Sequence, residues 1–226
     1  MHQRRRRFVV IITALAALGA YIAANLPGLA PNETPSSGGG ELASAVLETL
    51  PVKGRAPKTG YKRSQFGDGW ARTDGCDTRN LILRRDLANP VVADDNCKVS
   101  SGTLSDPYTG ETIEFKRGAQ TSAAVQVDHV VALSNAWQTG AQQLSAEQRV
   151  QLANDPLELL AVDGPANQQK SDGDAATWLP SNKPFRCQYV ARQIAVKRKY
   201  ALWVTEPEKS AMTRVLAACP EQTVPA

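Results

Sequence analysis

Asp128 and His129 bring together the residue types best suited to metal binding and proton transfer. His129 is the only histidine after position 2, and imidazole, with an ordinary pKa of about 6.5, exchanges protons readily near neutral pH. The stretch 124–131 alternates apolar and polar residues, which predicts a strand whose neighbouring side chains point to opposite faces unless it bends or ends there. A single strand histidine is more often structural than catalytic, so the chemistry depends on the residues downstream.

Further polar residues follow in order along the chain. Asn154 precedes the run LELL at 157–160, and NQQKSD at 167–172 comes directly after a Gly-Pro turn. In this order, DH…N…LELL…NxxKSD, residues 128–172 resemble the HNH endonucleases. More loosely, the stretch from Tyr61 to Cys219 resembles the exported, disulfide-bearing HNH proteins of bacteria through its YxRxxFGxxW, DPYTG, DHVVALSNAW and WLP motifs.

The resemblance implies a fold and a division of roles. In HNH endonucleases an Asp-His pair on one strand, a second strand and the following helix form a ββα-metal site. His129 would be the general base that deprotonates a water, and Asp128 and Asn167 would bind a divalent cation. Asn154 would hold the loop between the strands and so orient the histidine. Mg²⁺ suits a site with few protein oxygens because it keeps much of its hydration shell; Mn²⁺, Ca²⁺, Ni²⁺ and Zn²⁺ stay open as alternatives.

The sequence also differs from the family pattern. Asn167 stands where a histidine is common, and Ala132 stands where the family often has proline. Residues 135–153 form a longer insertion than a minimal motif needs, and the assignment of Asn154 depends on the insertion ending there. Lys170 occupies the family's basic position on the metal helix, where its ammonium would contact a phosphate; a solvated surface lysine is the equal alternative.

Charge gives only local support for nucleic-acid binding. The chain has 26 Lys and Arg against 22 Asp and Glu, and Arg4 to Arg7 account for the whole excess. The stretch 184–205, however, carries several cations and no acid: Arg186, Arg192, Lys197, Arg198 and Lys199. Arg192 and Lys197 are therefore candidate phosphate contacts. The alternative is that this stripe is the solvated face of an amphipathic helix.

The N-terminus and the cysteines indicate export. Arg4 to Arg7 precede an uncharged apolar stretch of 19 residues, Phe8 to Leu26, which fits a signal peptide or an uncleaved membrane anchor within residues 1–30. Residues 31–40 are a flexible linker. All four cysteines follow it and none forms a CxxC pair, so two disulfides are expected. Of the three possible pairings we favour Cys76–Cys97 and Cys187–Cys219, because each closes a short loop.

The remaining pattern predicts an α+β domain over residues 41–226. Helical spacing and capping signals predict helices at 41–50, 145–153, 166–171, 184–204 and 205–219. Alternating and apolar runs predict strands at 112–116, 124–131 and 157–162. Together with the resemblance, this gives an HNH-type ββα-metal core at 124–172, with additional helices and a disulfide-bearing N-terminal mixed region.

The expected function is an exported, metal-dependent endonuclease that hydrolyses phosphodiester bonds in DNA. Two alternatives belong to other classes: a non-catalytic extracytoplasmic binding or envelope protein that retains the HNH framework, and a phosphoesterase acting on a small or cell-surface diester. The expected partner is nucleic acid, with DNA favoured over RNA. No protein partner is predicted, and membrane contact is expected only through residues 8–26 if they are not cleaved.

Overall fold

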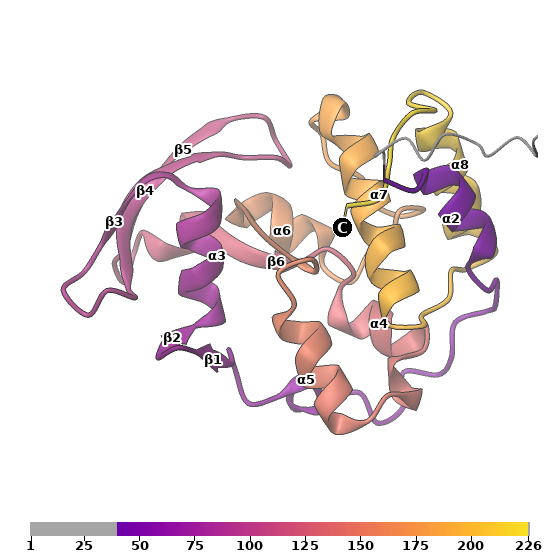
Figure 1. The fold of residues 1–226 in the computed structure, drawn as a ribbon, viewed down its shortest axis with the longest axis horizontal. Helices are drawn as coiled ribbons and strands as arrows, with labels where there is room; N and C mark the ends of the chain where they lie inside the picture. Colours follow the sequence, from indigo (N-terminus) through magenta and orange to yellow (C-terminus); the bar gives the residue numbers. More distant parts are fainter. Residues whose placement is uncertain (1–39, 226) are drawn as a thin grey trace, which may run out of the picture. The chain divides into compact units, whose positions relative to one another are not determined.

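The computed structural model describes residues 40–225 of the chain. The predicted signal peptide or anchor at 1–30 and the linker at 31–40, apart from Gly40, lie outside the described residues. Within residues 40–225 no helix is both long enough and apolar enough to cross a bilayer. The described part is an α+β domain of helices and small sheets (Figure 1).

The N-terminal part combines an expected helix with one that the sequence analysis missed. α2 spans Ala43–Thr49 and buries its apolar side, as its spacing predicts. An irregular segment then leads to the 3-10 turn η1 at Arg63–Phe66. The short strands β1 (Arg72–Thr73) and β2 (Cys76–Asp77) follow. The helix missed is α3 (Thr78–Asp86), and it begins where the Asp77 carboxylate accepts a hydrogen bond from the backbone N–H of Asn80.

Three antiparallel strands form a sheet at one end of the domain, on the left in Figure 1. They are β3 (Ala88–Val92), β4 (Val99–Ser105) and β5 (Thr112–Lys116), paired in that order. β5 has the bounds that its alternation predicts. Buried residues of this sheet pack against α3 and form a small second core, which includes Ile82, Leu83, Val99, Leu104 and Phe115.

The central unit is a two-stranded antiparallel sheet followed by a helix. β6 spans Val125–His129 and pairs with β7 at Leu159–Asp163, so that Asp128 lies opposite Leu160. α6 spans Gly164–Lys170. The order strand, strand, helix is the one that the resemblance implies. Between the strands lie α4 (Leu133–Gln138), the short turn η3 (Ala141–Gln143) and α5 (Ala146–Asn154), and the predicted Ser145–Gln148 capping box opens α5.

The start of α6 differs in detail from the expectation. Gly164 and Pro165 were expected to precede the helix, but they form its first turn. Proline is favoured there because the first helical N–H groups have no partner within the helix, and Asp163 caps the helix by accepting from the backbone N–H of Ala166 at 2.7 Å. A Cβ on Gly164 would lie 2.0 Å from the carbonyl oxygen of Ala123, in the 3-10 turn that precedes β6, so only glycine allows this turn and α6 to approach so closely.

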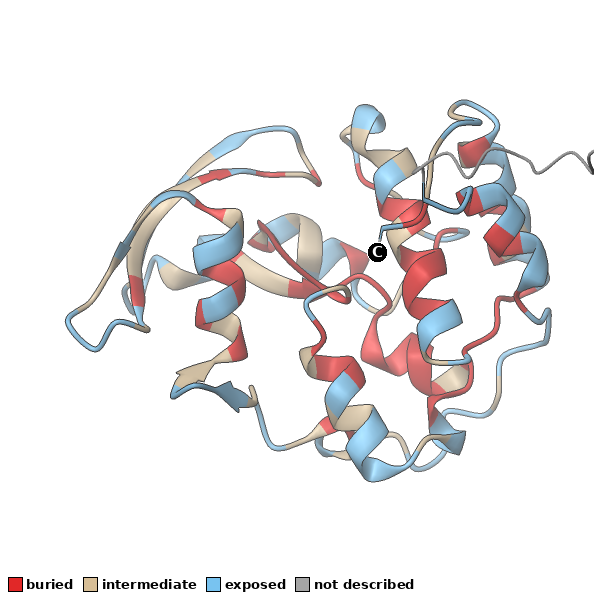
Figure 2. Cartoon of the chain, viewed as in Figure 1, coloured by how far each residue is buried: buried red, intermediate tan, exposed pale blue. Residues whose placement is uncertain are grey.

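The C-terminal third supplies most of the main core. α7 spans Arg186–Lys199 and α8 spans Glu206–Leu216, close to the predicted bounds. α7 is largely buried, as Figure 2 shows, and its apolar residues pack with α2, α4 and α8. The disulfides are Cys76–Cys97 and Cys187–Cys219, with Cα atoms 5.2 and 6.4 Å apart. These are the favoured pairs, and one disulfide lies in each half of the domain.

Candidate active site

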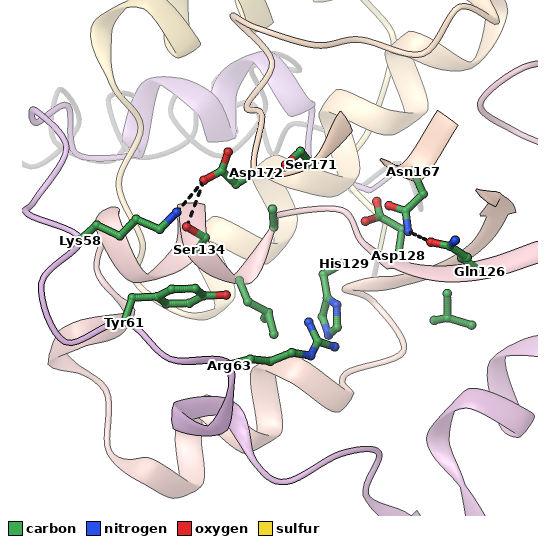
Figure 3. Close-up of a pocket in the computed structure, with 13 residues that line it drawn as sticks. Lys58, Tyr61, Arg63, Gln126, Asp128, His129, Ser134, Asn167, Ser171 and Asp172 are labelled. Carbon is green, nitrogen blue, oxygen red and sulfur yellow. Dashed lines mark hydrogen bonds and ion pairs between the residues drawn. The ribbon is translucent and has the colours of Figure 1, made fainter. Parts of the chain in front are cut away.

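The end of β6 opens into a polar pocket. Asp128 and His129, the last two residues of the strand, both line a pocket of about 470 Å³. Asn167 of α6, Lys58 and Tyr61 of the segment before η1, and Arg63 at the start of η1 line the same pocket (Figure 3). The strand ends at this point, so side chains that leave it in opposite directions still reach one cavity. Asp128, His129 and Asn167 therefore meet there, although Asn167 is distant from the other two in sequence.

Asp128 is buried at the base of the pocket and is held by two donors. The Tyr108 hydroxyl donates to Oδ2 at 2.5 Å, and the Lys170 ammonium contacts the carboxylate at 3.0 Å. Burial raises the pKa of Asp128, more than the nearby Lys170 and Tyr108 lower it. The same ammonium donates to the backbone carbonyl of His129 at 2.8 Å, so it fixes the end of the strand as well as the carboxylate.

His129 is buried, yet its imidazole lines the pocket from one side. Nε2 lies 2.9 Å from the carbonyl oxygen of Ala153. A carbonyl can only accept a hydrogen bond, so Nε2 carries the proton and Nδ1 keeps a free lone pair. The Trp70 indole stacks on the imidazole, with ring centroids 5.6 Å apart and planes 4° from parallel. Burial lowers the pKa of His129 to about 3, so the ring is neutral at physiological pH.

Asn167 brings a second side-chain oxygen to the pocket. Its Nδ2 donates to the Gln126 side chain at 2.9 Å, and Gln126 lies two residues before Asp128, on the same side of β6. Figure 3 shows the Asn167 amide beside the Asp128 carboxylate. Because the amide nitrogen is used by Gln126, the Oδ1 atom of Asn167 is left to bind a ligand.

These residues fit a hard divalent cation. A carboxylate offers about four lone-pair positions, so Asp128 keeps acceptor capacity beside Tyr108 and Lys170. Asp128 and Asn167 would supply two oxygen ligands and leave the other positions to water and phosphate, as Mg²⁺ prefers. Within residues 40–225 no group of three or more His, Cys, Asp or Glu side chains could hold a metal, so a closed zinc site does not fit the described chain.

Asn154 and Glu158 both make hydrogen bonds in the loop between β6 and β7. Asn154 accepts from the backbone N–H of Ala71 at 2.8 Å and donates to the backbone carbonyl of Val150, so it fastens the loop between the strands to the segment next to Trp70. That loop is held by Glu158, whose side chain accepts from the backbone N–H of Val131 at 3.2 Å. Glu158 is fully buried, and burial raises its pKa well above the ordinary value.

The structure contradicts the phosphate-binding roles predicted for Lys170 and Lys197. Lys170 is 2% exposed, and its ammonium forms an ion pair with Asp128. Lys197 is fully buried and pairs with Glu208 at 3.0 Å. Arg192 is half-buried, and its guanidinium donates to the backbone carbonyls of Leu157 and Pro156 at 2.6 and 2.9 Å. These three side chains brace the interior and the loop before β7.

Several residues of the site escaped the sequence analysis. Glu158 was visible as a charge within an apolar strand, and Gln126 as the residue two places before Asp128. Tyr108 belongs to the DPYTG motif and Arg63 to the YxRxxFGxxW motif. Those motifs supported the family resemblance, but no role could be assigned to Tyr108 or Arg63. Nothing in the local sequence pattern says which part of the fold these side chains contact.

Comparisons with known proteins agree with the resemblance in outline. The sequence model of the family described as "GmrSD restriction endonucleases, C-terminal domain" matches residues 77–215. An uncharacterized secreted protein of Arthroderma benhamiae is 38% identical over 211 residues, covering 92% of this chain and 98% of that protein. This relative is fungal, so it does not support the bacterial source that the resemblance implied. No solved structure matches the chain.

Proposed function

Because the chain belongs to the family of GmrSD restriction endonuclease C-terminal domains, we propose that it is an exported, metal-dependent endonuclease that hydrolyses phosphodiester bonds in DNA. One observation carries this proposal: Asp128, His129 and Asn167 line a single polar pocket at the junction of β6 and α6. A carboxylate, an amide and an imidazole with a free nitrogen are the groups that such a reaction requires.

In this mechanism His129 acts as the general base. Its Nε2–H donates to Ala153, which holds the ring in one tautomer and leaves Nδ1 to take a proton from the attacking water. Trp70 on the ring face and Glu158 under the following loop keep the imidazole in position. Asp128 and Asn167 would hold the divalent ion. When bound, the ion would offset the negative charge that develops on the phosphate oxygens.

Two features support export. The relative from Arthroderma benhamiae is described as secreted, and the domain has two disulfides with no free cysteine among residues 40–225. Disulfides form and persist in oxidising compartments outside the cytoplasm. We extend the same location to this protein. An anchor at residues 8–26 would lie outside the described residues and stays a sequence prediction.

Nicking of supercoiled plasmid DNA by the purified protein tests the proposal. We expect cleavage with Mg²⁺ and loss of cleavage with EDTA. His129→Ala should lower the rate by about 10² or more, the usual contribution of a general base. Asn167→Ala should raise the Mg²⁺ concentration needed for half-maximal rate by about tenfold or more.

Gln168→Ala is the matched control, because Gln168 is exposed on the same helix and lines no part of the pocket. It should behave as the wild type. The variants must keep the wild-type melting temperature, so that a loss of rate reflects the site. A wild-type protein that cleaves equally well in EDTA, or a His129→Ala variant with full activity, would exclude this mechanism.

One observation favours the second candidate, a non-catalytic extracytoplasmic protein. Tyr108 donates to the Asp128 carboxylate and Lys170 offsets its charge, so the buried carboxylate has partners without a metal. This candidate predicts that neither Mg²⁺ nor Mn²⁺ raises the melting temperature and that no DNA is cleaved with any divalent ion.

A further inference from the structure

A segment outside the residues matched by the family model forms one wall of the candidate site. Residues 53–63, KGRAPKTGYKR, contain five cations and no acid; we name them the cationic strap. Lys58 and Arg63 of the strap line the pocket that also holds Asp128 and His129. Arg63 in addition lines a second pocket, of about 160 Å³, on the Trp70 side of the imidazole. Arg63 therefore borders both cavities that His129 lines.

The cations of the strap differ in what they contact. Arg55 is bound to the buried Asp174 at 2.6 Å, and Lys53 lies over the Trp203 ring, so both hold the strap to the domain. Lys58 pairs with Asp172 at 3.1 Å, and both side chains are about half exposed. Lys62 and Arg63 are exposed, and neither side chain has a hydrogen bond or ion pair with any residue of 40–225.

The backbone of the strap is fixed in place by contacts to α4 and its surroundings. The backbone N–H of Ala56 donates to Gln138 at 2.8 Å, and the Trp137 indole N–H donates to the Thr59 carbonyl at 3.3 Å. The Tyr61 ring packs on Trp137, with centroids 6.2 Å apart. A wall held in this way presents its charges with little loss of backbone entropy on binding.

Resting on the proposed function, we propose that the cationic strap is the surface that binds the phosphate backbone of the DNA. Arg63 contacts the phosphate beside His129, because it is the cation nearest the imidazole that has no partner in residues 40–225. Guanidinium suits this position since its planar donors match phosphate oxygens. Lys58 breaks its ion pair with Asp172 and contacts a neighbouring phosphate. Asp172 keeps the hydrogen bond that it accepts from Ser134.

Binding without cleavage is the first test. The background is His129→Ala in EDTA, and the probe is a short fluorescent DNA duplex whose dissociation constant is measured by anisotropy between about 50 and 200 mM salt. Arg63→Ala and Lys58→Ala should each weaken binding about tenfold, the loss of one charge-assisted contact. Each should also lower the slope of log K against log salt by about 0.9, the value for one phosphate contact.

Arg84→Ala is the matched control, because Arg84 is an exposed cation on α3 that lines neither pocket. It removes the same charge and should leave the slope unchanged. Arg63→Lys keeps the charge but not the planar fork, so it should keep the slope and still bind more weakly than the wild type. Lys58, Arg63 and Arg84 are all exposed, so their variants should match the melting temperature of the His129→Ala background.

The outcomes separate this inference from the proposed function. If Arg63→Ala and Lys58→Ala show the same slope of log K against log salt as Arg84→Ala, the strap does not bind DNA, whether or not the protein is a nuclease. If their slopes fall but the wild-type protein cleaves nothing with a divalent ion, the strap binds DNA and the proposed catalysis is wrong. If the duplex does not bind any variant or the wild type, the inference is overturned.

Discussion

Two segments of this protein carry the same charge in sequence and use it differently in the fold. The cationic strap at 53–63 and helix α7 at Arg186–Lys199 each contain five cations and no acid. In α7 the charges are matched from outside the helix: Lys197 by Glu208, Arg198 by Glu41 and Lys199 by Asp155. In the strap, Arg55 and Lys58 are also paired, with Asp174 and Asp172, but Lys62 and Arg63 have no such partner in the described part of the chain. A cluster of cations therefore indicates a binding surface only where the fold leaves it unmatched.

The difference follows from where each segment lies. α7 runs through the main core, so Lys197 and Arg192 on its buried sides must pair with a carboxylate or with carbonyls. Arg198 and Lys199 are paired at the surface. The strap crosses the surface beside the pocket, where water can solvate a charge that has no partner. Substitutions in the two segments should therefore affect different properties. Those in α7 should lower stability, and those in the strap should lower DNA affinity.

The largest effect is expected at Lys197. Lys197→Ala leaves Glu208 as a buried, unpaired carboxylate, which should lower the free energy of unfolding by about 3 to 5 kcal/mol. Urea denaturation measures this loss. Lys197→Met combined with Glu208→Gln should recover most of it, because Gln keeps the capping contact with Thr205 while removing the charge. If Lys197→Ala were as stable as Arg63→Ala, the contrast between the segments would disappear.

Arg192 should show a smaller effect of the same kind. Arg192→Ala removes charged hydrogen bonds to the carbonyls of Pro156 and Leu157, with an expected loss of about 1.5 to 3 kcal/mol in unfolding free energy. The salt dependence of DNA binding should stay at the wild-type value, with Arg63→Ala as the comparison. A change in that slope would mean that Arg192 reaches the phosphate backbone after all.

Asp155 links α7 to α5 and gives a pH-dependent effect. Partial burial opposes its ionisation, but hydrogen bonds from Lys199 and Tyr200 outweigh this and lower the pKa of Asp155. A carboxyl with a lowered folded pKa stabilises the fold above its unfolded pKa, about 3.9. Asp155→Asn should therefore be less stable than the wild type by about 1 kcal/mol near neutral pH. The gap should close as the pH falls through the folded pKa, as acid titration of urea midpoints would record.

Substitution of Lys53 should have the smallest effect. It distinguishes the part of the strap that is held to the domain from the part that is proposed to bind DNA. The Lys53 ammonium lies 5.1 Å from the centre of the Trp203 ring, so Lys53→Ala should cost about 0.5 to 1 kcal/mol, the value of an exposed cation–π contact. Thermal melting measures this cost. The salt slope should not change, in contrast to Lys58→Ala. An equal drop in slope for both would extend the DNA-binding surface along the whole strap.

Local signals in the sequence were enough for many elements. Alternation gave β5, the capping box gave the start of α5, and the spacing of cysteines favoured the pairs observed. α3 was missed because its sequence, TRNLILRRD, buries Thr78 and Asn80 as well as apolar residues, which weakens the helical period. β3 and β4 were missed because their sequences, ANPVV and VSSGTLS, do not alternate cleanly between apolar and polar residues and contain a proline and a glycine, which weakens the strand signal.

In the candidate site, the sequence indicated Asp128, His129 and Asn167, and the structure brings them to one pocket. The bracing residues were not predictable in the same way. Lys170 was expected at the surface, since lysine is rarely buried unless paired, and its partner lies 42 residues away. Asn154 was chosen for its position in a motif, while the contact to the loop after β6 is made by Glu158.

The sequence by itself determined which side chains could do chemistry and most of the helices and strands that carry them, because periodicity, caps and motifs act over a few residues. Only the tertiary structure decided which charges are paired inside the protein. That outcome depends on burial and on partners far away in the chain, and neither is encoded in a local pattern. Lys197 and Arg63 have the same charge in the sequence, and only the fold buries the first against Glu208 and leaves the second beside His129.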